Sequence, residues 1–302
     1  MDDFEKYVDE RIRYLNTLLE EPNRIMQAHV NRAINERLTA QELDRSLSVI
    51  NSKYDEIQEI LSAFSDRIIP DAYNSGVDIS SDTLRQVNAL FTKNTRDIKT
   101  INFLINDMQK NYNGAIEMGR ESVATYFNLS KQVRISEQDI SKAVAQGLMD
   151  GGTGEDAKRA LRNMLEDSSN TIYDRDKLMK FAAGYEDKLE DGKFMQIINK
   201  NGDVMNFKTD SYADMVARTR IGDAQVAGAV DIAEENGVNE FNVTDHHTTT
   251  AICIPHEGQI YTTNPNNKKY EQLYPDNKPV YHPNCLHRLM PYVDILRSEY
   301  ND

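Results

Sequence analysis

Apolar residues along the first part of the chain recur every three or four positions, which is the spacing of one face of an α-helix. The first such run extends from Phe4 to about Leu19. Pro22 then interrupts the pattern. Because proline suits the first turn of a helix, we expect a second, short helix from there to about Leu38. The pattern therefore predicts a helical start to the chain with a break at the proline.

A long helix is expected next. Thr39 and Glu42 stand three positions apart, as in a capping box, where each side chain bonds the backbone N–H of the other residue. Pro70 follows the apolar stripe, and proline inside a helix removes a backbone hydrogen bond, so we predict that the helix ends near this residue. The stripe consists of Leu43, Leu47, Ile50, Tyr54, Ile57, Leu61, Phe64 and Ile68.

A second long stripe begins near Ser81 and ends at Tyr112, and further helices are expected to about Asn128 and from Ser136 to Leu148. Two long stripes of this kind predict antiparallel helices. The helices could bury their apolar seam within the chain, or they could present it to another subunit as a docking surface. The second stripe consists of Leu84, Val87, Phe91, Ile98, Ile101, Ile105, Met108 and Tyr112.

The periodicity changes after residue 190. Two short apolar runs flank an Asn-Gly pair that ends at Gly202, and this pair between such runs is a strong signal for a β-hairpin. A helix is expected from Ser211 to about Glu235, with Gly237 suited to its C-terminal end. The last part of the chain is rich in Pro and Asn and predicts short strands at 241–244, 259–261 and 289–293.

These elements predict a mainly α fold class: long antiparallel helices followed by a small α+β C-terminal domain with a Cys/His-rich knuckle. We place the helical domain at residues 1–190 and the α+β domain at residues 193–302.

The composition narrows the classes of function. The chain has 302 residues, of which 39% are hydrophobic, and no apolar run approaches the roughly 18 residues that a membrane span needs. The net charge of −14 argues against a surface that coats nucleic acid, because phosphate binding needs clustered Lys and Arg. The acidic N-terminus lacks the parts of a secretion signal. We expect a cytoplasmic chain with no membrane contact, and any DNA contact confined to a local patch.

Five of the six histidines and both cysteines fall within residues 245–292. Thiolate and neutral imidazole are the ligands that zinc prefers, and a structural site needs four of them in a tetrahedral arrangement. A long segment that is rich in loops also needs a cross-link of this kind to hold it in a compact structure. We therefore predict a closed structural zinc site. The predicted ligands are Cys253, His282, Cys285 and His287, with His256 as the alternative fourth ligand.

Other interpretations of this segment stay open. The spacing does not match the paired C-x-x-C signature, so the cysteines could also be packed reduced thiols, or form one disulfide if the compartment allowed it. The tripeptide ending at His247 matches the name of the DHH phosphoesterases, but no alternation of strands and helices precedes it. A cysteine and a histidine could form a nucleophile and its base, or the segment could form a ββα-type nuclease. Neither interpretation comes with a recognisable scaffold in the rest of the chain. We expect no enzyme, with a metal-dependent hydrolase or nuclease using this cluster as the alternative.

Three passages, at residues 212–219, 253–261 and 282–292, carry a resemblance to a known family. They contain an Arg-Thr helix, a cysteine followed by a Gly-centred turn, and a His-Pro-Asn-Cys segment. Together they resemble the phage minor capsid and Mu F-like head morphogenesis family. Leu286 stands where arginine is usual in that family, and Arg220 stands where an acid often follows Arg-Thr.

The resemblance implies a minor protein of the phage head that acts in head morphogenesis and is bound at the portal vertex. The partners it implies are the portal protein and the major capsid or scaffold protein, with DNA contacted locally at most. It implies assembly in the host cytoplasm and a final location in the virion, in the head interior or at the portal vertex. The helical region at 1–190 would then dock to the portal or capsid. The resemblance does not imply an enzyme.

Overall fold

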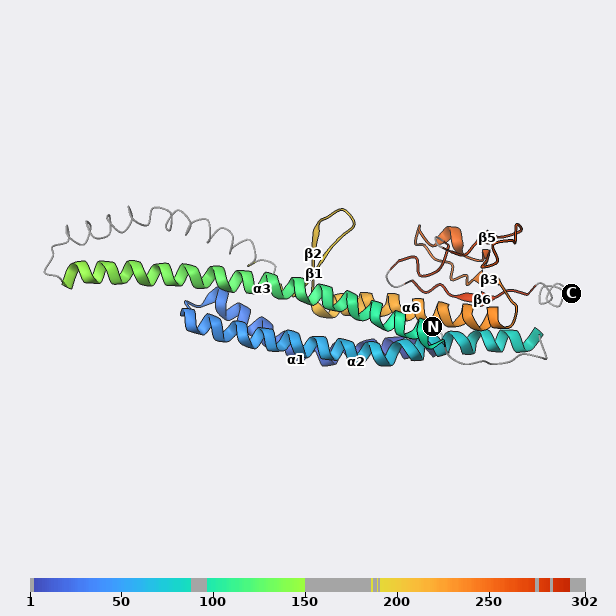
Figure 1. Ribbon diagram of the computed structural model, residues 1–302, viewed down its shortest axis with the longest axis horizontal. Coiled ribbons are helices and arrows are strands. Elements are labelled where there is room, and N and C mark those ends of the chain that lie inside the picture. The colour runs from blue at the N-terminus through green and yellow to red at the C-terminus, as the bar shows by residue number, and fades with distance from the viewer. Residues whose placement is uncertain are drawn as a thin grey trace. The chain divides into compact units, whose positions relative to one another are not determined.

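A computed structural model describes the chain as long helices followed by short strands (Figure 1). The predicted mainly α fold class is confirmed. None of the helices in the described part of the chain combines the length and the apolar character that a membrane crossing requires. The described residues are 3–87, 97–149, 186, 189, 191–274, 277–282 and 285–293.

Two compact units are each built from separate segments of the chain. The sheet unit consists of Met1–Thr17, Glu59–Tyr112 and Ser211–Asp302, and the hairpin unit consists of Leu18–Gln58 and Asn113–Asp210. These units are defined by their compactness. The domains expected at 1–190 and 193–302 stay a prediction.

Helix α1 (Asp3–Asn35) continues through Pro22, so the predicted break there is wrong. Leu19 and Met26, on either side of the proline, are fully buried. Burying two such side chains contributes about 3–6 kcal/mol together, which equals or exceeds the cost of about 3 kcal/mol for a proline inside a helix. The continuous apolar stripe therefore decides the course of the helix.

Helix α2 (Ala40–Val87) begins at the predicted capping box. The backbone N–H of Thr39 donates to Glu42 Oε2 at 2.8 Å, and the backbone N–H of Glu42 donates to Thr39 Oγ1 at 3.3 Å. These two bonds satisfy donors that the start of a helix otherwise leaves unpaired. The capping box is confirmed.

The same helix continues through Pro70, so the predicted end near this residue and the predicted new helix from Ser81 are both wrong. Ile68, Ile69 and Tyr73 are buried around the proline. As at the first proline, burial on both sides of the missing hydrogen bond keeps the helix intact.

Helix α3 (Ile98–Met149) is also one element, although separate helices ending near Asn128 and starting at Ser136 were expected. Buried positions lie on both sides of residue 128, at Val123 and Phe127 before it and at Val133 after it. Since these residues keep one face of the helix covered, no packing reason for a break arises there.

Helices α2 and α3 run antiparallel, as predicted. In the sheet unit, Gln109 Nε2 of α3 donates to Ser62 Oγ of α2 at 3.0 Å. In the hairpin unit, Lys131 Nζ pairs with Asp44 Oδ2 at 2.6 Å. From Gln109 to Lys131 along α3, the contacted residue of α2 changes from Ser62 back to Asp44, as antiparallel helices require. The stripe residues Ile50, Tyr54, Ile57 and Leu61 of α2 are fully buried within the chain, whereas Ile98 of the second stripe is 65% exposed.

The expected hairpin is present in the hairpin unit. Strands β1 (Met195–Ile198) and β2 (Val204–Phe207) pair antiparallel. Gly202 in the turn has a φ of +89°, a backbone conformation that residues other than glycine rarely adopt. The Asn-Gly signal therefore worked as expected.

Helix α6 (Thr209–Glu235) ends as predicted. Gly237 has a φ of +77°, and the backbone N–H of Val238 bonds the carbonyl of Ala233 at 2.9 Å, which is the pattern of a glycine helix cap. Within the sheet unit, α6 packs on α2 at a close backbone approach, where Gly76 lies against the Gln225 carbonyl.

Strand β3 lies at the centre of the second sheet, whose order is β5-β4-β3-β6. The predicted strands are confirmed, and β3 lies between β4 and β6, paired antiparallel with each of them. Phe241 and Val243 of β3 are fully buried, as suits a central strand. The strands are β3 (Glu240–Val243), β4 (Ile260–Thr262), β5 (Glu271–Gln272) and β6 (Leu289–Pro291).

The core of the sheet unit joins this sheet to α6 and to the end of α2, and Figure 1 shows β3 and β6 next to α6. Burial of these side chains holds the sheet on the helices and gives the loops around β3 a fixed base. The core residues are Leu84, Val226, Val230, Ala233, Phe241, Val243, Tyr261, Leu273 and Leu289.

Candidate metal centre

Cys253 is placed by a tight turn between β3 and β4. Its backbone N–H bonds the carbonyl of Thr250 at 2.9 Å, and the short 3-10 helix η1 (Ile254–His256) follows at once. Gly258 then turns the chain back with a φ of +68°, and its N–H bonds the Val243 carbonyl at 3.0 Å. The turn leaves the thiol of Cys253 fully buried.

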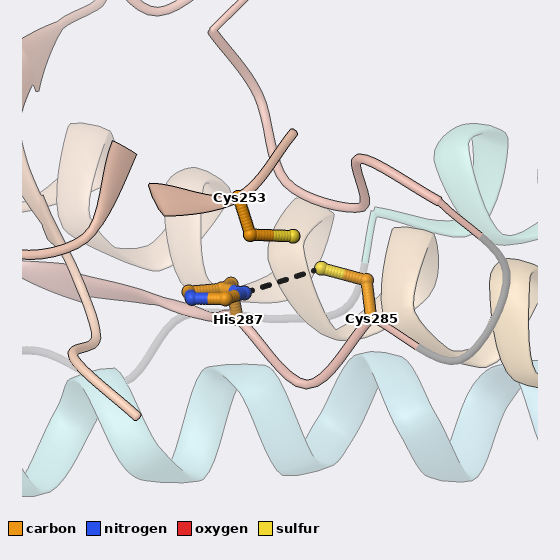
Figure 2. Close-up of side chains that lie close together, drawn as sticks. All are labelled: Cys253, Cys285 and His287. Atoms are coloured by element: carbon orange, nitrogen blue, oxygen red, sulfur yellow. Dashed lines mark hydrogen bonds between the residues drawn. The ribbon is translucent and has the colours of Figure 1, made fainter. Parts of the chain in front are cut away.

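Cys285 and His287 are placed by the segment that leads into β6. The β3–β6 ladder extends one step further, where the backbone N–H of Thr244 bonds the Arg288 carbonyl at 3.0 Å. The backbone N–H of Arg288 in turn donates to Thr244 Oγ1 at 3.0 Å. Positions two apart on an extended chain face the same side, so both side chains point toward Cys253 (Figure 2).

The three side chains form a group of potential metal ligands. One ligand atom from each of Cys253, Cys285 and His287 lies within 4.8 Å of the others, and Cys285 Sγ is 3.4 Å from His287 Nδ1. Zinc–sulfur bonds of about 2.3 Å in a tetrahedral site place two sulfurs about 3.8 Å apart. The group is therefore close enough to hold a metal ion, and two thiols with one imidazole match the donors that zinc prefers.

Both cysteines are free thiols, and their surroundings fit a metal better than a reactive group. Burial and the adjacent Cys285 sulfur raise the pKa of the Cys253 thiol to about 11. Without a metal this thiol is protonated at neutral pH. A bound cation would reverse that preference, because a coordinating thiol loses its proton.

Of the predicted fourth ligands, neither His282 nor His256 belongs to this group in the described part of the chain. Nδ1 of His256 lies 2.8 Å from the Tyr261 hydroxyl, and its ring stacks on Tyr281 with 4.1 Å between centroids. Three of the predicted ligands are thus brought together by the fold. The fourth stays a prediction.

Glu257 is a residue of the site that the sequence did not single out. Its Oε1 lies 3.0 Å from His287 Nε2, and it accepts the backbone N–H groups of His246 and Thr248 at 2.9 and 3.0 Å. Burial alone would raise the pKa of Glu257, but these donors lower it to about 2. Glu257 is therefore an ionised acceptor for the imidazole. The sequence carries no signal for this role, because the contact with His287 joins residues thirty positions apart.

Residues 184–301 match the model of the family described as phage minor capsid protein 2. This region belongs to a phage minor capsid protein family. The match covers the hairpin, α6, both sheets and all three ligands of the candidate centre. No curated protein and no solved structure matches the chain.

Over residues 184–301 the family match confirms the phage minor capsid part of the resemblance, and it supports a phage head protein. Its description names a structural protein of the virion, in agreement with the expectation of no enzyme. The Mu F-like part of the resemblance stays a prediction.

The Asp-His-His tripeptide of this minor capsid region lies outside the candidate centre. The side chain of His247 is 92% exposed, with Nδ1 3.2 Å from Asp245 Oδ1, and Nε2 of His246 is 2.9 Å from Thr244 Oγ1. In the described residues, neither histidine belongs to a group of three potential metal ligands. The geometry thus adds no support to a two-metal hydrolase.

The start of α1 adds a further contact that the sequence pattern gave no reason to expect. The guanidinium of Arg288, next to His287, lies over the Phe4 ring at 5.5 Å and 3.5 Å from Glu5 Oε1. The sheet unit therefore ties the first turn of the chain to the segment that carries two of the three ligands.

Proposed function

We propose that this protein is a minor component of the phage head that binds the portal protein at the head vertex and acts in head morphogenesis. The family match over residues 184–301 is the observation that carries the proposal. The helical part supports a docking role. Helices α2 and α3 have 48 and 52 residues, and at about 1.5 Å per residue they are about 72 and 78 Å long.

The docking surface proposed on the helices includes exposed apolar residues of α3. Phe103 is 68% exposed and Ile98 is 65% exposed, although both are large apolar residues. Both lie in the first two turns of α3, and we propose that they take part in the contact with the partner. The net charge of −14 offers DNA no broad basic surface, so we assign these contacts to the portal and to the major capsid or scaffold protein.

The test is to purify heads made with the wild-type gene and to quantify and cross-link the protein in them. We expect a low copy number and cross-links to the portal protein. Phe103→Ser should reduce these cross-links, while Ile198→Ser should not, because Ile198 is 60% exposed on the hairpin and serves as a matched apolar control. Absence of the protein from purified heads would overturn the head function. A loss confined to Ile198→Ser would overturn docking through the helices.

We also propose that the candidate centre holds a structural zinc ion. Cys253, Cys285 and His287 supply three ligands, and His282 completes the site, with His256 as the alternative. The convergence of two thiols and an imidazole supports this assignment. When bound, zinc would contribute folding free energy by linking the turn before β4 to the segment before β6.

Metal analysis of the purified protein tests this proposal. We expect about one zinc per chain. Cys285→Ser should release the metal and melt the region after about residue 241, while the N-terminal helices stay folded. His282→Ala should weaken binding more than His256→Ala. Much less than one zinc per chain, with both thiols titrating freely, would show that the cysteines are packed thiols.

A further inference from the structure

We propose that Glu257 is the positioning residue of the zinc centre: it holds His287 in the tautomer that carries hydrogen on Nε2 and presents Nδ1 to the metal. This inference rests on the zinc centre proposed above. It adds a residue that sequence spacing does not reveal, and it names the ring nitrogen that binds.

The carboxylate of Glu257 sets the hydrogen position on His287. Its Oε1 already accepts two backbone N–H groups and lies 3.0 Å from His287 Nε2, so it is the acceptor in this contact and the hydrogen lies on that nitrogen. A neutral imidazole then has its lone pair on Nδ1. This is the atom that faces Cys285 Sγ at 3.4 Å. The two nitrogens therefore have distinct roles, the outer one as donor and the inner one as ligand.

Glu257 is itself held in place. Backbone N–H groups of His246 and Thr248 donate to its carboxylate, and the Thr248 N–H lies 3.0 Å from Oε1 and 3.2 Å from Oε2. The side chain of Glu257 is 12% exposed and that of His287 is 3% exposed. A carboxylate that is fixed by main-chain donors can orient a buried imidazole ring. Metal-binding histidines usually need such a partner on the ring nitrogen that does not bind the metal.

Glu257 does not itself lie where it could bind the metal as a ligand. Glu257 bonds the nitrogen on the side of the ring away from the thiols, and it does not belong to the group of atoms within 4.8 Å. It lies four residues after Cys253 in the same turn. The turn therefore supplies both a ligand and the group that orients another ligand, which explains how two distant segments form one site.

The experiment compares zinc affinity, by competition with a chromophoric chelator, in wild type, Glu257→Ala and Glu257→Gln. Loss of an orienting partner lowers metal affinity about 10- to 100-fold, so we expect that range for Glu257→Ala. Glu257→Gln should recover part of the affinity, because its amide oxygen can still accept the Nε2 hydrogen. Glu234→Ala, on the exposed face of α6, is the control and should leave the affinity unchanged.

A second readout separates positioning from general stability. Nitrogen NMR of the zinc-loaded wild type should show His287 with hydrogen on Nε2 and metal on Nδ1, and the cobalt-substituted protein should change its absorption spectrum in Glu257→Ala. Metal on Nε2, or equal affinity in wild type and Glu257→Ala, would overturn this inference and leave the zinc site standing. A wild type that binds no zinc would instead overturn the zinc proposal. If Glu257→Ala fails to fold, Glu257→Gln and the wild-type spectrum decide.

Discussion

The close approach of α2 and α6 in the sheet unit predicts an unusual effect of Gly76→Ala. Replacing glycine by alanine inside a helix normally stabilises it by about 1 kcal/mol. At Gly76 the new Cβ would overlap the carbonyl oxygen of Gln225, and it would lie 2.8 Å from that carbonyl carbon and 3.0 Å from the Ala229 nitrogen. These neighbours are backbone atoms, which cannot swing away as a side chain can.

The magnitude follows from the displacement that the backbone must make. Ordinary contacts start at 3.4 Å, and the Gln225 oxygen lies closer to the new Cβ than the carbon at 2.8 Å. The two backbones must therefore move apart by more than the 0.6 Å that the carbon alone would require. Overpacking of this kind costs about 1–3 kcal/mol, and here it also loosens contacts along the interface. Subtracting the gain of about 1 kcal/mol in helix propensity leaves a net destabilisation of up to about 2 kcal/mol.

The assay is urea unfolding followed by circular dichroism, with hydrogen exchange of the α6 amides reporting on the sheet unit. Gly114→Ala is the matched control, because no heavy atom lies within 4 Å of a Cβ at that position of α3. It should stabilise the protein by up to about 1 kcal/mol. If both variants stabilised the protein equally, the close approach of α2 and α6 would be refuted.

Three further predictions concern the hairpin unit, the start of α2 and the metal. Tyr54→Phe removes the buried bond from the hydroxyl to the Phe194 carbonyl at 3.0 Å and should cost about 1 kcal/mol in urea unfolding, whereas the 56% exposed Tyr14→Phe should be neutral. The backbone N–H and the hydroxyl of Thr39 hold the pKa of Glu42 below its ordinary value of 4.5. The pKa of Glu42 is lower in the folded state than in the unfolded state. This stabilisation is therefore fully present when the pH is above the unfolded-state pKa, and it is lost as the pH falls through the folded-state pKa. Glu42→Ala should therefore lower the melting temperature more at pH 7 than at pH 2, and an equal loss would contradict the linkage. Adding a chelator should lower the melting temperature of the zinc-loaded sheet unit but not that of the hairpin unit, and a response of both would contradict a local role for the metal.

Local sequence signals specified much of this fold. Apolar periodicity specified the long helices, the capping box specified the start of α2, and the Asn-Gly pair ending at Gly202 specified the hairpin. These signals act over a few residues, through backbone conformation and hydrogen bonds between near neighbours, so they can be read without knowledge of the rest of the chain. The concentration of cysteine and histidine in one segment likewise indicated where a metal centre would lie.

Tertiary packing decided the features that local rules predicted wrongly or left open. Pro22 and Pro70 do not end their helices, because buried apolar residues on both sides outweigh the lost hydrogen bonds. The position of β3 between β4 and β6 follows from burial of both of its apolar residues, which spacing alone does not reveal. The role of Glu257 depends on a contact with His287, thirty residues further along the chain. The sequence by itself determined which residues form elements and which could bind a metal. The three-dimensional fold determined which of them meet, because a contact between distant segments is set by the packing of everything between them.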